Sequence, residues 1–217
     1  MEKIQVHNLI ILDESGSMED IKKQVISGFN ETVQTIKASQ EEFPDQEQYI
    51  TFVSFNSSGI NTIRFAETAD KLREIDGQVY KPNGGTPLFD AMGFSILRLE
   101  NHLRSLNPDS YRVLVTILTD GYENASREYS ASVIKTLVER LKTGNWTFVY
   151  VGTDHDVETI TQSISIDNSM YFDKSEADLD MMFSNERNSR RAYYRNVSEK
   201  SEKFKDFFDN KSDKKKK

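Results

Sequence analysis

Cysteine is absent from the sequence of 217 residues, and this absence excludes several classes of protein. Without a thiol there is no disulfide framework, no thiolate zinc site and no cysteine nucleophile. Long hydrophobic runs are missing as well, because no apolar stretch approaches the roughly 20 residues that a membrane-spanning helix needs. The first residues, 1–7, lack the basic segment and apolar core of a signal peptide, so we expect a cytoplasmic protein without a membrane partner.

Nucleotide-binding motifs are also missing. The chain has neither a Walker loop nor a Gly-x-Gly-x-x-Gly segment, so the sequence predicts no nucleotide partner. The net charge of −7 disfavours binding of nucleic acid over the whole surface. The histidines, His7, His102 and His155, show neither metal-ligand spacing nor a paired nucleophile.

The most informative stretch begins with an apolar run, Leu9–Leu12, which is typical of a strand covered on both faces. Oxygen-bearing side chains follow it at alternate positions, namely Asp13, Ser15 and Ser17, and a glycine between the serines permits a sharp turn. Carboxylate and hydroxyl oxygens are hard ligands that suit Mg²⁺ or Ca²⁺. Two interpretations fit this spacing: a metal site, or a cap of the following helix by Ser17 or Asp20.

Strands and helices alternate along the rest of the chain. Strands are predicted over residues 6–12, 49–55, 61–65, 111–119, 146–151 and 169–172. Helices are predicted over about 19–37, 87–105 and 130–141 and from about 176 onward, with shorter helical segments at 69–75 and after 153–156. The link between the second and third strands is too short for a crossover, so the third strand is expected at an antiparallel edge. The alternation predicts a doubly wound α/β fold, with a mostly parallel central sheet and helices on both faces.

Ligands of open α/β sheets lie beyond the carboxyl ends of the strands, where three segments of this chain are expected to meet. These segments are Asp13-Glu-Ser-Gly-Ser17, Gly85-Thr-Pro87 and Thr119-Asp-Gly121. In order and approximate spacing they resemble the metal-ion-dependent adhesion site of von Willebrand factor A-type domains. The resemblance covers about residues 6–172 and is nearest to stand-alone bacterial domains associated with stress and tellurite resistance.

The resemblance implies a function and a role for each site residue. Ser15, Ser17 and Thr86 would be direct hydroxyl ligands, and Asp13 and Asp120 would be carboxylates that often act through water. Mg²⁺ is the expected metal, with Mn²⁺ or Ca²⁺ as alternatives. A cation with few direct negative ligands stays electrophilic, so the expected partner is a protein that supplies an Asp or Glu carboxylate.

Two of the motif residues also have a purely structural interpretation. Thr86 would then cap the helix that begins near Pro87, and Asp120 would stabilise a turn with Gly121. Further acidic residues stand close to the motifs, either as solvated helix starts or as a rim that favours a partner carboxylate flanked by basic residues. These residues are Glu14, Glu19, Asp20, Asp90 and Glu123.

The sequence therefore predicts a non-enzymatic interaction module, against two alternatives. The first is a metal-dependent phosphate-ester hydrolase, for which Glu14 and Asp90 are the candidate general bases. The second is an anionic-polymer binder that uses the arginines and tyrosines of residues 187–195, although a solvated helix face that also docks on the domain is preferred and nucleic acid is not an expected partner.

Three parts of the chain are predicted. Residues 1–183 form the A-type domain, residues 184–210 form a helical extension with sparse apolar positions, and residues 211–217 form a disordered lysine-rich tail.

Overall fold

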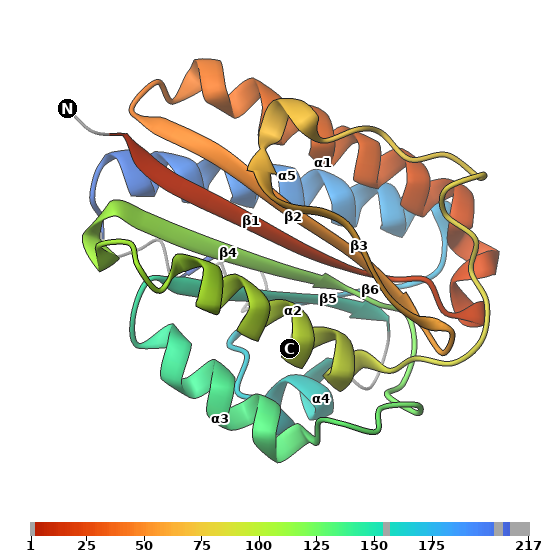
Figure 1. Ribbon diagram of the computed structural model, residues 1–217. Coiled ribbons are helices and arrows are strands. Elements are labelled where there is room, and N and C mark those ends of the chain that lie inside the picture. The colour runs from red at the N-terminus through yellow and green to blue at the C-terminus, as the bar shows by residue number, and fades with distance from the viewer. Residues whose placement is uncertain (1–2, 154–156, 202–205, 209–217) are drawn as a thin grey trace, which may run out of the picture.

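The computed structural model describes residues 3–153, 157–201 and 206–208, and these form a single sheet with helices on both faces (Figure 1). The sheet has the strand order β3-β2-β1-β4-β5-β6. Every neighbouring pair is parallel except β2 and β3, which run antiparallel. The strands are β1 (Ile4–Asp13), β2 (Gln46–Asn56), β3 (Gly59–Thr68), β4 (Tyr111–Leu118), β5 (Trp146–Thr153) and β6 (Asn168–Phe172). The predicted doubly wound fold and its antiparallel edge strand are confirmed.

The helices cover the two faces unequally. Helices α1 (Lys22–Glu42) and α5 (Glu176–Ser198) lie on one face of the sheet. Helices α2 (Leu88–Leu103), α3 (Ala131–Lys142) and α4 (Val157–Ser163) lie on the other (Figure 1). A short 3-10 helix, η1 (Gly16–Ile21), joins β1 to α1, and two further 3-10 turns are η2 (Ala69–Lys71) and η3 (Pro108–Ser110).

Strand β1 lies at the centre of the sheet, hydrogen-bonded to β2 on one side and to β4 on the other. Its side chains alternate between the two cores: Ile10 and Leu12 pack on the α1 and α5 side, while Leu9 and Ile11 pack on the α2 and α3 side. Both faces are therefore apolar, which explains why the run Leu9–Leu12 shows no polar alternation. The predicted central pairing of the first and fourth strands is confirmed.

Helix α5 docks on the domain along its whole length. Leu179, Met182 and Phe183 are buried in its first turns, and Tyr193 and Val197 are buried near its end. The predicted boundary between residues 183 and 184 falls inside this continuous helix. The predicted tail, residues 211–217, lies outside the described residues.

Arg190 of α5 is fully buried, so the expected solvated arginine face is wrong at this position. The guanidinium forms an ion pair with Glu186 one helical turn earlier. It also donates to Asn8 Oδ1 and Thr116 Oγ1, at 2.8 Å each. Because Asn8 and Thr116 belong to β1 and β4, this polar cluster fixes α5 to the middle of the sheet.

Candidate metal centre

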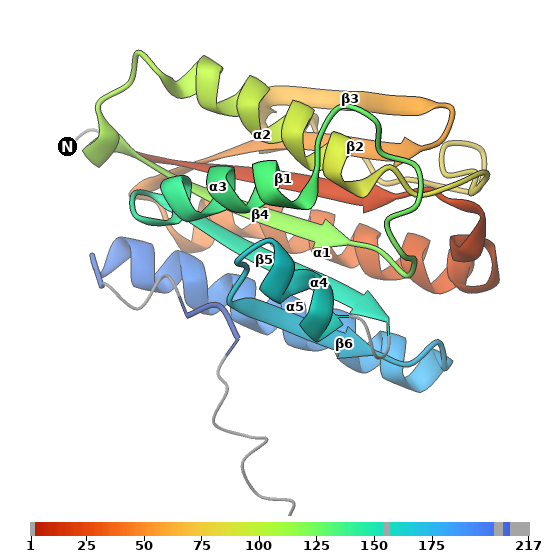
Figure 2. The same ribbon diagram turned by 90° about the horizontal axis from the view of Figure 1, so that it is seen from below.

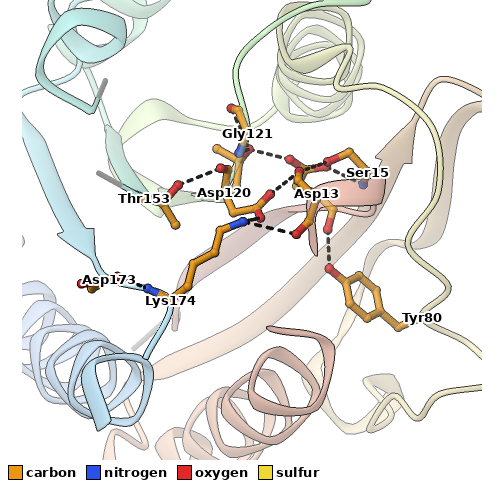
Figure 3. A network of polar contacts seen from close by, with 10 residues as sticks. Asp13, Ser15, Tyr80, Asp120, Gly121, Thr153, Asp173 and Lys174 are labelled. Atoms are coloured by element: carbon orange, nitrogen blue, oxygen red, sulfur yellow. Dashed lines mark hydrogen bonds and ion pairs between the residues drawn. The ribbon is translucent and has the colours of Figure 1, made fainter. Parts of the chain in front are cut away.

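The three predicted segments meet where the central strands end; Figure 3 shows two of them, with Asp13 and Ser15 beside Asp120 and Gly121. Asp13 is the last residue of β1, and Asp120 follows the end of β4 by two residues. Since β1 and β4 are adjacent and parallel, their carboxyl ends open at the same edge of the sheet. The chain therefore brings the two carboxylates together by topology alone.

Asp13 is fully buried and held in one orientation. Its Oδ1 accepts a hydrogen bond from the Ser15 main-chain N–H at 2.7 Å, and its Oδ2 accepts from Thr119 Oγ1 at 2.5 Å. Its carbonyl oxygen accepts from the Tyr80 hydroxyl at 2.6 Å. Burial raises the pKa of Asp13 to about 6, against the opposing effect of these hydrogen bonds. The side chain is therefore a fixed anchor for the turn that carries the two serines.

The serine hydroxyls connect this anchor to the second carboxylate. Ser15 Oγ lies 3.1 Å from Ser17 Oγ, and Ser17 Oγ donates to Asp120 Oδ1 at 2.6 Å. Ser15 is buried, whereas Ser17 is exposed. A ligand from outside would therefore approach this row of oxygens from the Ser17 side.

Thr86 reaches the same place from the loop before α2. Asn124 holds this loop, because its side-chain oxygen accepts from the Thr86 N–H at 2.9 Å and its own N–H donates to the Thr86 carbonyl at 3.2 Å. Gly121 shows how closely the oxygens converge. A Cβ added to Gly121 would lie 3.1 Å from Thr86 Oγ1, 3.2 Å from Ser17 Oγ and 3.8 Å from Asp13 Oδ2. Three oxygens from two of the segments thus face one small space that the glycine of the third segment leaves open.

The residues fit a hard divalent cation on two grounds. The convergent atoms are hydroxyl and carboxylate oxygens, which Mg²⁺ prefers. In addition, Gly121 leaves a small space open beside Thr86 Oγ1, Ser17 Oγ and Asp13 Oδ2, although the buried Asp120 Oδ2 already forms an ion pair with Lys174. Among the described residues no group of three or more His, Cys, Asp or Glu side chains forms a metal cluster, so hydroxyls must supply part of any coordination here. The structure brings all five predicted side chains together, and metal binding by them remains a prediction.

Lys174 is a charged residue of the site that the sequence did not indicate. It lies in the link between β6 and α5, and its Nζ is 2.5 Å from Asp120 Oδ2 and 3.3 Å from the Ser17 carbonyl oxygen (Figure 3). Its ammonium offsets one of the two carboxylate charges. No motif surrounds Lys174, and its partners lie far away in the sequence, so no local pattern could reveal it.

Two of the acidic neighbours do not form a rim around the site. The Asp90 carboxylate accepts hydrogen bonds from the main-chain N–H groups of Arg127, Glu128 and Tyr129, at 2.8–2.9 Å. The Glu123 carboxylate likewise accepts from main-chain N–H groups at the start of the same loop. Their role is to fold the loop after β4, so the interpretation as a rim is wrong for both.

His7 and His102 stand apart from the site. His7 is buried, stacks on Tyr49 at a ring distance of 4.8 Å and meets His102 edge to face at 6.5 Å. Burial, and then the nearby His102, lower the pKa of His7 to about 4. His155 lies outside the described residues.

Fold and site together define a doubly wound α/β domain with an oxygen-rich loop cluster at the carboxyl ends of its central strands. The family model described as the von Willebrand factor type A domain matches residues 9–186, and the chain belongs to this family. No curated protein sequence matches the chain at the significance required.

Solved structures show the same fold at low sequence identity. The pilus adhesin SpaC from Lactobacillus rhamnosus GG, in an open conformation, is similar with a TM-score of 0.61 and 15% identity over 92% of this chain and 30% of its own. Two structures of proximal thread matrix protein 1 from the mussel byssus give TM-scores of 0.58 and 0.51, with 16% and 14% identity. Each match covers 84% of this chain and 47% or 45% of the mussel protein, so this chain spans less than half of these structures. Within the described residues, no helix is both long and apolar enough to cross a membrane.

Proposed function

We propose that the chain is a metal-dependent protein–protein interaction module. Mg²⁺ is held by Asp13, Ser15, Ser17, Thr86 and Asp120, and a carboxylate of a partner protein completes the site. The observation that carries this proposal is the space beside Gly121, where hydroxyl and carboxylate oxygens of Asp13, Ser17 and Thr86 converge. Membership of the von Willebrand factor type A family supports it.

The residues divide the work between them. Asp13 is buried and doubly hydrogen-bonded, so it orients the turn that presents Ser15 and Ser17. The Asp120 carboxylate accepts a hydrogen bond from the Ser17 hydroxyl and forms an ion pair with the Lys174 ammonium. A metal bound by Asp120 must therefore share this carboxylate with a lysine. The bound metal supplies a positive centre that attracts an outside carboxylate. Because the ligands are neutral hydroxyls and two carboxylates, we expect weak, exchangeable Mg²⁺ binding and replacement by Mn²⁺.

Electron paramagnetic resonance of bound Mn²⁺ tests directly whether an outside carboxylate binds the metal. Protein loaded with Mn²⁺ would be titrated with acetate and, as a matched probe without charge, with acetamide. We expect acetate to change the Mn²⁺ spectrum and acetamide to leave it unchanged. A spectrum that responds to neither probe would contradict carboxylate binding at the metal.

The hydrolase alternative has less support. Of its two candidate bases, Glu14 accepts a hydrogen bond from the Lys81 N–H at 2.7 Å, and Asp90 accepts three from the loop after β4. Asp90 is thereby committed to folding the loop, and Glu14 has one of its two carboxylate oxygens engaged by the main chain. Turnover of p-nitrophenyl phosphate that depends on Asp13 would nevertheless establish the hydrolase.

The anionic-polymer alternative is weakened because three of the arginines it requires form ion pairs within the protein. Arg190 is buried with Glu186, while Arg187 pairs with Glu31 and Arg191 pairs with Glu42 of α1. These ion pairs serve the docking of α5 and leave little free positive charge on this helix. The cytoplasmic location and the kinship with tellurite-resistance domains stay predictions.

A further inference from the structure

A groove of about 890 Å³ adjoins the candidate metal centre. Its floor is one face of α2, and its walls are the β2–β3 turn and the loop after β4, which lies beside the first turns of α2 (Figure 2). Pro87 and Asn124 line the end nearest the site. Pro87 directly follows Thr86, and the Asn124 side chain accepts from the Thr86 N–H. The groove and the metal centre therefore share their positioning residues.

The charged groups in this groove leave a net positive charge. Arg98 and Arg127 line it and are exposed, and Asp90, the remaining charged lining residue, has its carboxylate saturated by main-chain N–H groups. Arg98 lies over the ring of Phe65 at 4.0 Å and donates to Thr62 Oγ1, and no ion pair holds Arg98 or Arg127 among the described residues. An acidic ligand complements them.

The buried hydroxyl of Ser95 also indicates that a ligand occupies the groove. Ser95 lines the groove and is only 5% exposed, yet its hydroxyl has no hydrogen-bond partner among the described residues. An unpaired buried hydroxyl is costly unless something arrives to bond it. Next to it, Phe94 is 46% exposed and offers apolar surface. A polypeptide segment supplies both an N–H or C=O for Ser95 and a side chain for Phe94.

We infer that this groove holds an extended acidic segment of the partner, continuous with the residue whose carboxylate binds the metal. This inference rests on the function proposed above. From Pro87 to Arg98, α2 advances roughly 16 Å at about 1.5 Å per residue. An extended chain covers that distance in about five residues at about 3.3 Å each. The partner segment thus carries one Asp or Glu for the metal and a second acidic residue about five positions away, facing Arg98.

Residues 214–217 do not suit the groove, because all four are lysine and the groove is bordered by two arginines.

Labelled peptides in saturating Mg²⁺ test the spacing. Each peptide has an Asp near one end and a Glu placed about three, five or seven residues away, with fluorescence polarisation as the readout. We expect the tightest binding at the spacing of about five. Arg98→Gln should weaken that peptide about three- to fivefold, which is the worth of one exposed ion pair, and should remove the preference for spacing.

Two comparisons sharpen the result. Arg104→Gln, a change at the exposed end of the same helix and outside the groove, should leave peptide binding unchanged. Arg98→Glu should bind a peptide whose Glu is replaced by Lys better than the unaltered protein does. Equal affinity for all spacings, with Mg²⁺ bound normally in calorimetry, would overturn the groove while leaving the proposed function intact. Failure of the same samples to bind Mg²⁺ would overturn the proposed function and the groove with it.

Discussion

Gly121→Ala should remove metal binding while leaving the fold intact. The new methyl carbon would lie 3.1–3.8 Å from Thr86 Oγ1, Ser17 Oγ and Asp13 Oδ2. Mg²⁺ binds oxygen at about 2.1 Å, so an ion held by these atoms needs the space that the methyl group would fill. The two shortest contacts are with rotatable hydroxyls, so we expect a loss of only about 1 kcal/mol in the free energy of unfolding.

Thermal denaturation with and without Mg²⁺ measures this effect. Ligand binding stabilises the folded state by about 2.7 kcal/mol at a concentration near 100 times Kd. For a chain of this size that corresponds to a rise of about 5–10 °C in Tm. The unaltered protein should show this rise, which EDTA should reverse, and Gly121→Ala should show none.

Gly144→Ala provides the matched control. Its added Cβ would meet only the Leu141 carbonyl oxygen, at 3.5 Å, far from the metal centre. This variant should keep the full Mg²⁺-dependent rise. A Gly121→Ala protein that Mg²⁺ stabilises as much as the unaltered protein would show that the metal does not occupy the space beside Gly121.

Three further changes follow from the same structure. Lys174→Met should raise Mg²⁺ affinity about three- to tenfold in calorimetry, because it removes the ammonium that shares Asp120; an unchanged or lower affinity would refute competition between the two cations. Arg190→Met should lower the free energy of unfolding in urea by about 3–5 kcal/mol, because Glu186 is left buried and unpaired, and a second change of Glu186 to Gln should recover part of the loss. Acidification should destabilise the fold through His7, whose pKa of about 4 lies below the ordinary 6.5. As the pH falls below 6.5, His7 is protonated in the unfolded chain while it stays neutral in the folded protein, so the free energy of unfolding decreases. This decrease ends near pH 4 and amounts to at most about 3 kcal/mol. His7→Phe should make the free energy of unfolding less dependent on pH in this range.

The overall fold could be predicted because its signals are local. The run Leu9–Leu12 and the apolar core of β4 lack polar alternation, which places both strands in the interior of a parallel sheet. The brief link from β2 to β3 forces an antiparallel edge. In segment 69–75 the predicted helix is a 3-10 turn of only three residues, Ala69–Lys71. Helix α1 also begins later than predicted, because η1 takes up residues 16–21.

The candidate site was predictable only as far as its motifs extend. Spacing identifies the five oxygen-bearing residues, since each stands at a strand end or in a glycine-rich loop. Spacing says nothing of Lys174, Tyr80 or Asn124, which reach the site from other loops through the folded topology. The burial of Arg190 had one signal in the sequence: polar residues, Asn8 and Thr116, stand inside two otherwise apolar strands and need a partner there.

Calorimetry with Mg²⁺ and Mn²⁺ on the unaltered protein, Asp13→Ala and Thr86→Ala tests the metal centre most directly. The unaltered protein should bind either ion weakly. Thr86→Ala should bind more weakly still, because two hydroxyls and two carboxylates remain. Asp13→Ala should bind neither, since it removes the anchor of the serine turn, while circular dichroism shows an intact fold. Metal binding by Asp13→Ala equal to that of the unaltered protein would contradict the assignment of this site.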